Sequence, residues 1–159
     1  MKKQKKNPRE IKGKEIKKAT LQDIKRITTL FNQTDFLADK VEHSEDTYYN
    51  LVDIRDYMSD KKVETFKYMI GKIIAGFAMV FYRKQYFMRF LVVDKKYYRK
   101  GIGTALLKFT ENRAFKKGIK YAESTTLSSN NSIAKMLLKN GYRRGEKHYF
   151  WFKKLFQNN

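Results

Sequence analysis

Apolar residues recur along the chain at two spacings, one typical of helices and one typical of strands. Over residues 21–31 they lie three or four positions apart, which predicts a helix with one apolar face. Thr20 stands just before this stretch and Asp23 follows three residues later, a pair that predicts a capping box at the start of the helix. Gly71 and Lys72 separate two strand-like stretches and predict the tight turn of a hairpin.

The same two spacings divide most of the chain into helices and strands. The predicted helices cover 21–31, 45–58, 102–115 and 131–139. The predicted strands cover 15–19, 63–70, 73–82, 86–94, 119–126, 142–144 and 149–155. This order of elements predicts a mixed α/β sheet in one layer, with helices on its faces.

The length of 159 residues suits one domain with one hydrophobic core. Residues 1–14 hold seven lysines and arginines against a single acid, Glu10, and the first apolar residue after Met1 is Ile11. We therefore expect a mobile basic tail over 1–14 and a single domain over 15–159.

Cysteine is absent and only two histidines occur. Disulfides, thiolate metal sites and cysteine nucleophiles are therefore excluded, and a zinc site or a Ser-His-Asp triad is disfavoured, so we expect no metal. No apolar run reaches the roughly 20 residues that span a bilayer, and no apolar signal stretch follows the basic N-terminus. We expect a cytoplasmic protein without a membrane partner.

The formal net charge is +20 at pH 7. A charge of this size attracts polyanions and steers anionic ligands toward the protein. Three explanations stay open: proximity to nucleic acid or the ribosome, an acidic substrate or cofactor, or the composition of an AT-rich or heat-adapted genome. Because runs of charge usually form solvated faces, the charge by itself assigns no partner.

A glycine-containing segment follows the predicted strand 86–94 and opens the next helix. Gly101 and Gly103 let backbone amides turn toward a ligand, and the unpaired N–H groups at a helix N-terminus attract anions. Arg99 and Lys100 add positive charge beside them. On its own such a loop is more often a plain entry into a helix than a phosphate site. It lacks the third glycine of a dinucleotide-binding motif and the G-K-[ST] of a P-loop.

The surroundings of this loop are more specific than the loop itself. Residues 92–107, VVDKKYYRKGIGTALL, resemble the cofactor-binding motif of the GNAT superfamily of N-acetyltransferases. A second stretch looks like that family's motif of an Asn, a helix and a Gly-aromatic pair; its residues are Asn130, Ala134, Leu137, Leu138, Gly141 and Tyr142. Residues 16–24 are similar to the family's opening and 70–76 to its strand hairpin, so the resemblance covers roughly 15–155.

The resemblance implies an α/β (α+β) fold with a mixed, largely antiparallel central sheet of six to seven strands and about four helices on its faces. It also implies acetyl-CoA as the acetyl donor. The strand backbone would pair with the pantetheine arm, with a Val92 or Val93 amide facing the acetyl carbonyl. Backbone amides from Arg99 to Thr104 would hold the pyrophosphate, and Asn130 would flank the thiol end. The implied cofactor-binding residues are Leu91, Val92, Val93, Arg99, Lys100, Gly101, Ile102, Gly103, Thr104 and Asn130.

The sequence departs from the family's pattern at three places, of which the first concerns a phosphate contact and the other two leave the acid and the base open. Tyr98 stands where relatives carry Gln or Arg, and Leu137 replaces the tyrosine that protonates the departing thiolate. The strand 86–93 holds Arg89 but no carboxylate. Tyr142 is one candidate acid, although strand tyrosines mostly pack. The candidate catalytic residues are Asp94 and Glu123 as base and Tyr149 as acid.

Two functions stay open. The first is acetyl transfer to a primary amine by direct attack, the acceptor being an amine-bearing small molecule, a peptide N-terminus or a lysine. The alternative is a catalytically weakened GNAT-like binding module whose basic surface holds nucleic acid or a ribosome. The intact glycine segment favours the enzyme, whereas the missing tyrosine and strand carboxylate favour the module. A homodimer is also left open.

Overall fold

A computed structural model describes residues 14–33, 51–82, 85–126 and 130–146. The chain forms two compact units, residues 1–127 and 128–159, and each is described by itself. The tail predicted over 1–14 lies outside the described residues, except for Lys14, which begins the first strand.

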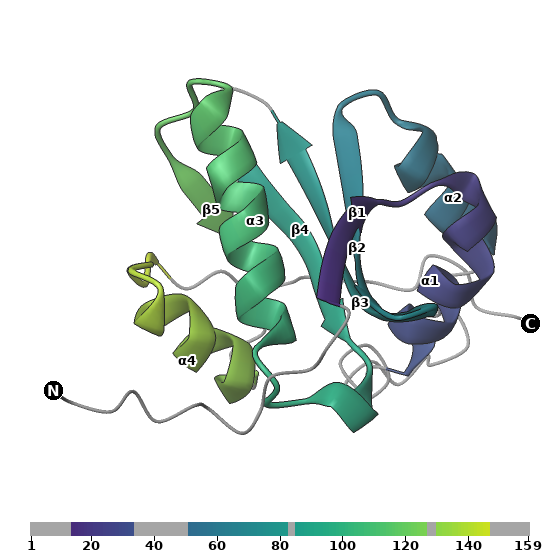
Figure 1. The fold of residues 1–159 in the computed structure, drawn as a ribbon. Coiled ribbons are helices and arrows are strands. Elements are labelled where there is room, and N and C mark those ends of the chain that lie inside the picture. Colours follow the sequence, from purple (N-terminus) through teal and green to yellow (C-terminus); the bar gives the residue numbers. More distant parts are fainter. Residues whose placement is uncertain (1–13, 34–50, 83–84, 127–129, 147–159) are drawn as a thin grey trace, which may run out of the picture. The chain divides into compact units, whose positions relative to one another are not determined.

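The first unit is built on a sheet with the strand order β1-β2-β3-β4-β5 (Figure 1). The strands are β1 (Lys14–Lys18), β2 (Val63–Ile70), β3 (Ile73–Tyr82), β4 (Tyr86–Val93) and β5 (Ala122–Ser124). The first four are antiparallel neighbours, whereas β5 runs parallel to β4. The predicted mixed, largely antiparallel sheet is thus confirmed.

The described residues contain five strands, slightly fewer than the six to seven expected. The strand predicted over 119–126 is shortened to the three residues of β5. The strand predicted over 142–144 is wrong: this segment follows the left-handed Gly141 (φ 89°) and pairs with no strand in the described part of the chain. The Tyr142 N–H donates to the Leu137 carbonyl at 3.1 Å, so the chain after Gly141 closes the C-terminus of α4. The strand predicted over 149–155 lies outside the described residues.

Helices cover both faces of this sheet, α3 on one face and α1 and α2 on the other (Figure 1). The α-helices are α1 (Ile24–Asn32), α2 (Leu51–Ser59), α3 (Ile102–Lys116) and, in the second unit, α4 (Asn131–Lys139). Two short 3-10 helices are η1 (Leu21–Asp23) and η3 (Lys95–Tyr97). The four predicted helices are therefore present; the part of the second one over 45–50 lies outside the described residues.

The local sequence explains several helix and turn boundaries. The predicted capping box is confirmed, since the Thr20 backbone N–H donates to a carboxylate oxygen of Asp23 at 2.8 Å. Asp23 also pairs with Lys67 Nζ at 2.7 Å, which ties η1 to β2. Gly71 (φ 57°) makes the β2–β3 turn, and Gly118 (φ 77°) follows the end of α3.

The core consists of two apolar layers, one on each face of the sheet. Phe77 and Met79 of β3 are fully buried with α1 and α2, and the ring of Phe31 lies 4.8 Å from that of Phe77. On the opposite face, the hydroxyls of Tyr86 and Thr110 form a buried hydrogen bond of 2.7 Å that joins β4 to α3. Burying each large apolar side chain stabilises the fold by about 1.5–3 kcal/mol, so these layers fix α3 against β4.

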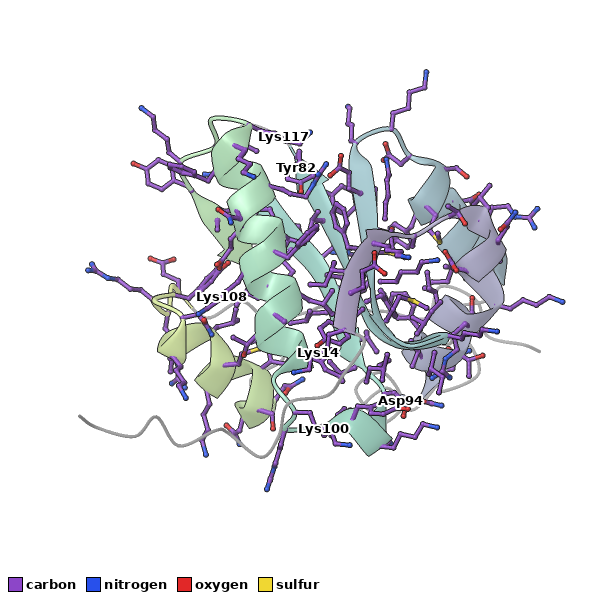
Figure 2. The ribbon with its side chains drawn as sticks, in the orientation of Figure 1. Lys14, Tyr82, Asp94, Lys100, Lys108 and Lys117 are labelled. Atoms are coloured by element: carbon purple, nitrogen blue, oxygen red, sulfur yellow. The ribbon has the colours of Figure 1, made fainter. Side chains whose placement is uncertain are left out.

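Ionic contacts hold the C-terminal half of α3. Arg113 donates to Glu64 of β2 through Nε at 3.1 Å and Nη2 at 3.0 Å. The Lys117 ammonium lies 4.8 Å from the centre of the Tyr82 ring. Figure 2 shows Lys117 and Tyr82 at one end of α3, whereas Asp94 lies near the other end. The N-terminal end of α3 is therefore free of these contacts.

Candidate active site

β4 carries a bulge that divides it into two halves. Met79 pairs with Phe90 and Val80 pairs with Met88, so Arg89 has no partner on β3. The pairing of β4 with β5 ends one residue earlier, where Met88 lies opposite Ser124. Beyond this point, the edge of β4 that faces away from β3 pairs with no strand among the described residues. We call this edge, from Arg89 to Val93, the open edge.

The direction of two backbone groups shows which amides face the open edge. The Asp94 N–H donates to the Ala75 carbonyl at 2.9 Å, and the Val92 carbonyl also points at β3, toward Gly76. Successive residues of a strand direct their N–H and C=O groups to opposite sides. The amides of Leu91 and Val93 therefore face the open edge, where an extended ligand can pair with them as a strand does.

Gly76 lets β3, β4 and the start of α3 come close together. A Cβ at this position would lie 2.7 Å from the Val92 carbonyl oxygen and 3.3 Å from Cγ2 of Ile102. Contacts under 3.0 Å to backbone atoms force a shift, so only glycine fits here without displacing the open edge. The close approach aligns the open edge with the N-terminus of α3.

The glycine loop, residues 98–104, turns the chain from η3 into α3. Arg99 (φ 59°) and Gly101 (φ 80°) both adopt left-handed backbone conformations, and Gly101 is the N-cap residue. It offers no side-chain cap to the helix. The first amides of α3 are therefore available to an anion, and the helix dipole favours negative charge there. This arrangement fits a pyrophosphate group.

Positive charge surrounds the glycine loop. Lys96 Nζ and Lys100 Nζ lie 5.6 Å and 5.1 Å from the centre of the Tyr97 ring. Arg99 and Lys100 are exposed, and Tyr98 is 51% exposed. Tyr98 is thus not buried against the fold, and backbone amides with flanking cations carry the anion-binding character of this loop.

Asp94 ends β4 and shapes the turn that leads to the glycine loop. Its carboxylate accepts from the Lys96 N–H at 3.1 Å, and its other oxygen lies 2.6 Å from Nη2 of Arg26 on α1. Nη2 of Arg26 also donates to the Ile74 carbonyl at 3.2 Å. Asp94 therefore links α1, β3 and β4 at the turn that leads to the glycine loop.

The protonation of Asp94 follows from these contacts. Burial alone would raise the pKa of its carboxyl, but the hydrogen bonds from Arg26 and the Lys96 amide, together with both positive charges, lower the pKa below 3.8. A carboxylate whose charged form is stabilised in this way is a poor proton acceptor near neutral pH. Asp94 is therefore better suited to positioning the glycine loop than to the predicted role of general base.

Glu123, the other predicted base, is exposed on β5 opposite Phe87. It lines a pocket of about 400 Å³, which we call the Arg89 pocket. The residues that line it are Tyr57, Phe81, Gln85, Phe87, Arg89 and Glu123. Glu123 thus lies in a concave site beside the bulge, whereas Asp94 lies at the far end of the open edge.

The remaining predicted residues lie in the second unit. Asn130 is the N-cap of α4, and its side-chain oxygen accepts from the Ile133 N–H at 3.2 Å. Tyr149, the predicted acid, lies outside the described residues. Within the described part of the chain, no group of three or more His, Asp or Glu is placed to hold a metal ion. No helix there has the length and apolar character needed to cross a membrane.

The sequence assigned no role to Arg26, Tyr57 or the bulge at Arg89. Arg26 lies on a helix far from Asp94 in the chain, and no local pattern links the two. A bulge leaves no trace in the apolar alternation, because Phe87 and Phe90 both look like ordinary strand residues. Gly76, a glycine inside a strand pattern, was the one available signal of a close backbone approach.

Comparisons with known proteins agree with this geometry. Solved structures of other proteins share the fold, among them the following three. A PaiA N-acetyltransferase from Thermoplasma acidophilum in complex with coenzyme A has a TM-score of 0.74 at 17% identity, covering 86% of this chain and 93% of that one. An aminoglycoside acetyltransferase from an uncultured soil metagenomic sample, in complex with sisomicin, has a TM-score of 0.69 at 14% identity, covering 89% and 96%. A transcriptional regulator from Bacillus halodurans C-125 has a TM-score of 0.67 at 20% identity, covering 86% and 99%.

At these identities the likeness shows the fold alone. No curated protein sequence matches the chain. The sequence itself, however, matches the family model of the acetyltransferase (GNAT) domain over residues 32–150, which is well over half of its length. The open edge, the glycine loop and this match together show that the chain belongs to the GNAT acetyltransferase family.

Proposed function

We propose that the chain transfers the acetyl group of acetyl-CoA to a primary amine by direct attack of the amine on the thioester. The observation that carries the proposal is the open edge of β4 leading straight to the uncapped N-terminus of α3. An extended arm ending in a pyrophosphate needs these two features in this order. Coenzyme A in the complex of the Thermoplasma relative supports the same donor here.

The open edge and the glycine loop divide the binding of acetyl-CoA between them. Amides from Arg99 to Thr104 would hold the pyrophosphate, with Lys100 as a flanking charge. Leu91 and Val93 amides would pair with the pantetheine arm. Because the arm runs from α3 back along β4, its acetyl end arrives near the bulge at Arg89. A backbone amide of β4 that faces the open edge near the bulge would stabilise the negative charge that develops on the thioester oxygen. This is the contribution expected of an oxyanion hole.

The chemistry requires two protons to leave the acceptor nitrogen, one before the attack and one after it. An ammonium group must lose a proton before its nitrogen can attack. The nitrogen then forms a bond to the carbonyl carbon while the carbon–sulfur bond breaks, and the departing thiolate takes up a proton. Glu123 lines the Arg89 pocket and would receive the amine proton there, directly or through water. We propose Glu123 as the base and assign Asp94 to positioning.

Two further residues belong to this proposal. Asn130 caps α4 in the second unit and would flank the thiol end, as the family's pattern implies. Tyr149 is the proposed acid for the thiolate, unless water fulfils that role. Each assignment is tested by a conservative variant: Asn130→Ser, which can still cap α4, and Tyr149→Phe.

The proposed function is tested by titrating acetyl-CoA in a calorimeter and then measuring CoA release over a panel of amines. We expect saturable binding of acetyl-CoA and turnover on at least one amine. Glu123→Gln should lower kcat by about 10²- to 10⁴-fold while acetyl-CoA affinity is unchanged. Binding of acetyl-CoA without turnover on any amine, accompanied by salt-sensitive RNA binding, would instead support the binding module.

A further inference from the structure

The Arg89 pocket lies beside the bulge, on the sheet face covered by α1 and α2. Phe81 of β3 pairs with Phe87 of β4, and Phe87 pairs in turn with Glu123 of β5. Residues directly opposite one another on neighbouring strands share a face, so these three side chains form a row across the sheet. Tyr57 of α2 completes the wall above them.

The walls of the pocket are largely aromatic. Phe81, Phe87 and Tyr57 line it, and the Tyr57 ring also packs edge-on against Phe90 at 5.7 Å. Aromatic walls bind an apolar or aromatic body through large contact areas. The pocket therefore suits a ligand with an uncharged hydrophobic part.

Two opposite charges stand at the same pocket. Arg89 is exposed, and its guanidinium lies over the Phe90 ring at 5.3 Å. Glu123 is exposed on the next strand. Among the described residues, neither side chain forms a salt bridge. Each can therefore receive a group of opposite charge from a ligand.

This balance of charges discriminates between classes of amine. A polyamine or an aminoglycoside carries several ammonium groups and needs several carboxylates around it. The Arg89 pocket has one carboxylate, and Arg89 would repel a second ammonium group. The net charge of +20 adds to that repulsion over longer distances.

We infer that the acceptor is a small zwitterion of the α-amino-acid class with an apolar or aromatic side chain. Its amine faces Glu123, its carboxylate faces Arg89, and its side chain lies among the aromatic walls. The inference rests on the proposed function. The bulge carries Arg89 one residue beyond the last β4–β5 pair, so the pocket opens where the acetyl end of the donor would arrive.

The reaction balances without a further reactant. The acceptor ammonium gives one proton to Glu123, and the neutral nitrogen forms a bond to the acetyl carbon as the carbon–sulfur bond breaks. The nitrogen releases its second proton, and the thiolate receives one from the proposed acid or from water. The products are an N-acetyl amino acid, CoA with a thiol, and the proton that Glu123 returns to solvent.

The test compares each free amino acid with its amide, which keeps the amine and the side chain but lacks the carboxylate. Phenylalanine, leucine and methionine, their amides, spermidine and an aminoglycoside are offered with acetyl-CoA, and CoA release is followed. A charge-assisted hydrogen bond contributes about 1.5–3 kcal/mol, so kcat/KM for the acid should exceed that for its amide by about 10- to 100-fold.

The variant Arg89→Gln separates the carboxylate contact from other effects. It should raise KM for the free amino acid by about 10- to 100-fold, leave the amide almost unchanged and leave acetyl-CoA affinity intact. Arg55→Gln is the matched control, because it removes an exposed cation of α2 that does not line the pocket. Arg55→Gln should change neither the KM for the free amino acid nor the KM for its amide.

Three outcomes would overturn the inference. Equal rates for acids and amides would do so, as would a preference for spermidine or the aminoglycoside. An Arg89→Gln variant that slows acid and amide equally would also contradict the carboxylate contact. In all three outcomes acetyl-CoA still binds and is turned over, so the proposed function stands. Failure of acetyl-CoA to bind would instead remove the proposed function itself.

Discussion

Replacing Arg26 by alanine should destabilise the protein more than replacing its partner Asp94 by asparagine. The two side chains differ in burial: that of Arg26 is 31% exposed and that of Asp94 only 7%. Arg26→Ala leaves a buried carboxylate without its counter-charge. Asp94→Asn leaves a guanidinium that can turn toward water, and the asparagine oxygen can still accept from the Lys96 N–H.

The expected size follows from the contacts that each variant loses. Arg26 makes a charge-assisted hydrogen bond of 2.6 Å to Asp94 and donates to the Ile74 carbonyl at 3.2 and 3.3 Å. Removing one partner of a fully buried pair costs about 3–5 kcal/mol, and partial exposure reduces that cost. We expect Arg26→Ala to lower the free energy of unfolding by about 2–3 kcal/mol and Asp94→Asn by about 1 kcal/mol.

The dependence on pH provides a sharper test. In the native protein the pKa of the Asp94 carboxyl is lowered. The ionised carboxylate therefore stabilises the fold at pH values above the pKa of the unfolded chain, and this stabilisation is lost as the pH falls through the folded-state pKa. In Arg26→Ala, burial remains while the main lowering contact is gone, so the pKa of Asp94 rises. Protonation then neutralises the buried carboxylate. The variant's loss in free energy of unfolding, relative to wild type, therefore becomes smaller as the solution is acidified.

Urea denaturation followed by circular dichroism, at about pH 7 and about pH 4.5, measures this difference. We expect the deficit of Arg26→Ala to shrink by more than about 0.5 kcal/mol between the two conditions. Arg55→Ala, which removes an exposed arginine of α2, should stay within about 0.5 kcal/mol of wild type at both. A deficit that does not change with pH would refute the electrostatic explanation.

The same variants decide between the two roles considered for Asp94. If Asp94 positions the loop, Asp94→Asn and Arg26→Ala should both weaken acetyl-CoA binding a few-fold, with a smaller effect on kcat. If Asp94 is the general base, Asp94→Asn should lower kcat by about 10²- to 10⁴-fold and alter the acidic limb of the pH–rate profile. Arg26→Ala should then spare kcat, because the carboxylate remains.

Two further variants probe the backbone around the proposed cofactor site, and a third probes an ion pair remote from it. Gly76→Ala places a methyl group 2.7 Å from the Val92 carbonyl oxygen, so it should cost about 1–3 kcal/mol in urea denaturation and weaken acetyl-CoA binding in calorimetry. Gly103→Trp should abolish acetyl-CoA binding by filling the glycine loop, and unchanged calorimetric affinity would contradict that placement. Arg113→Ala removes the partly exposed pair with Glu64 and should cost about 1 kcal/mol. Its acetyl-CoA affinity should be unchanged, since this pair lies toward the other end of α3.

The fold was predictable where local sequence determines structure. The hairpin at Gly71, the capping box at Thr20 and the helix over 131–139 each depend on residues close together in the chain, and each is confirmed. The strand predicted over 142–144 is wrong because the Tyr142 N–H donates to the Leu137 carbonyl at the end of α4. Three apolar or basic residues after a helix carry no information about whether another strand lies beside them.

For the same reason, the sequence could point to the proposed cofactor site but not to the proposed acceptor pocket. Residues 91–104 are continuous in the chain, and glycines followed by a helical pattern describe a backbone shape. The Arg89 pocket, by contrast, combines side chains from α2, β3, β4 and β5. Only the pairing of these elements brings Tyr57 and Glu123 together, and no spacing in the sequence encodes that pairing.

This difference also explains why the loss of family side chains need not remove the activity. The proposed pyrophosphate site consists of backbone amides, so Tyr98 in place of Gln or Arg should leave it intact, and about half of Tyr98 is exposed to solvent. Leu137 removes an acid whose task water can perform. Neither departure affects the open edge, the bulge or the Gly76 contact, which align donor and acceptor in the proposed mechanism. That mechanism, catalysis by alignment and by one base, requires only these backbone features and the proposed base, Glu123.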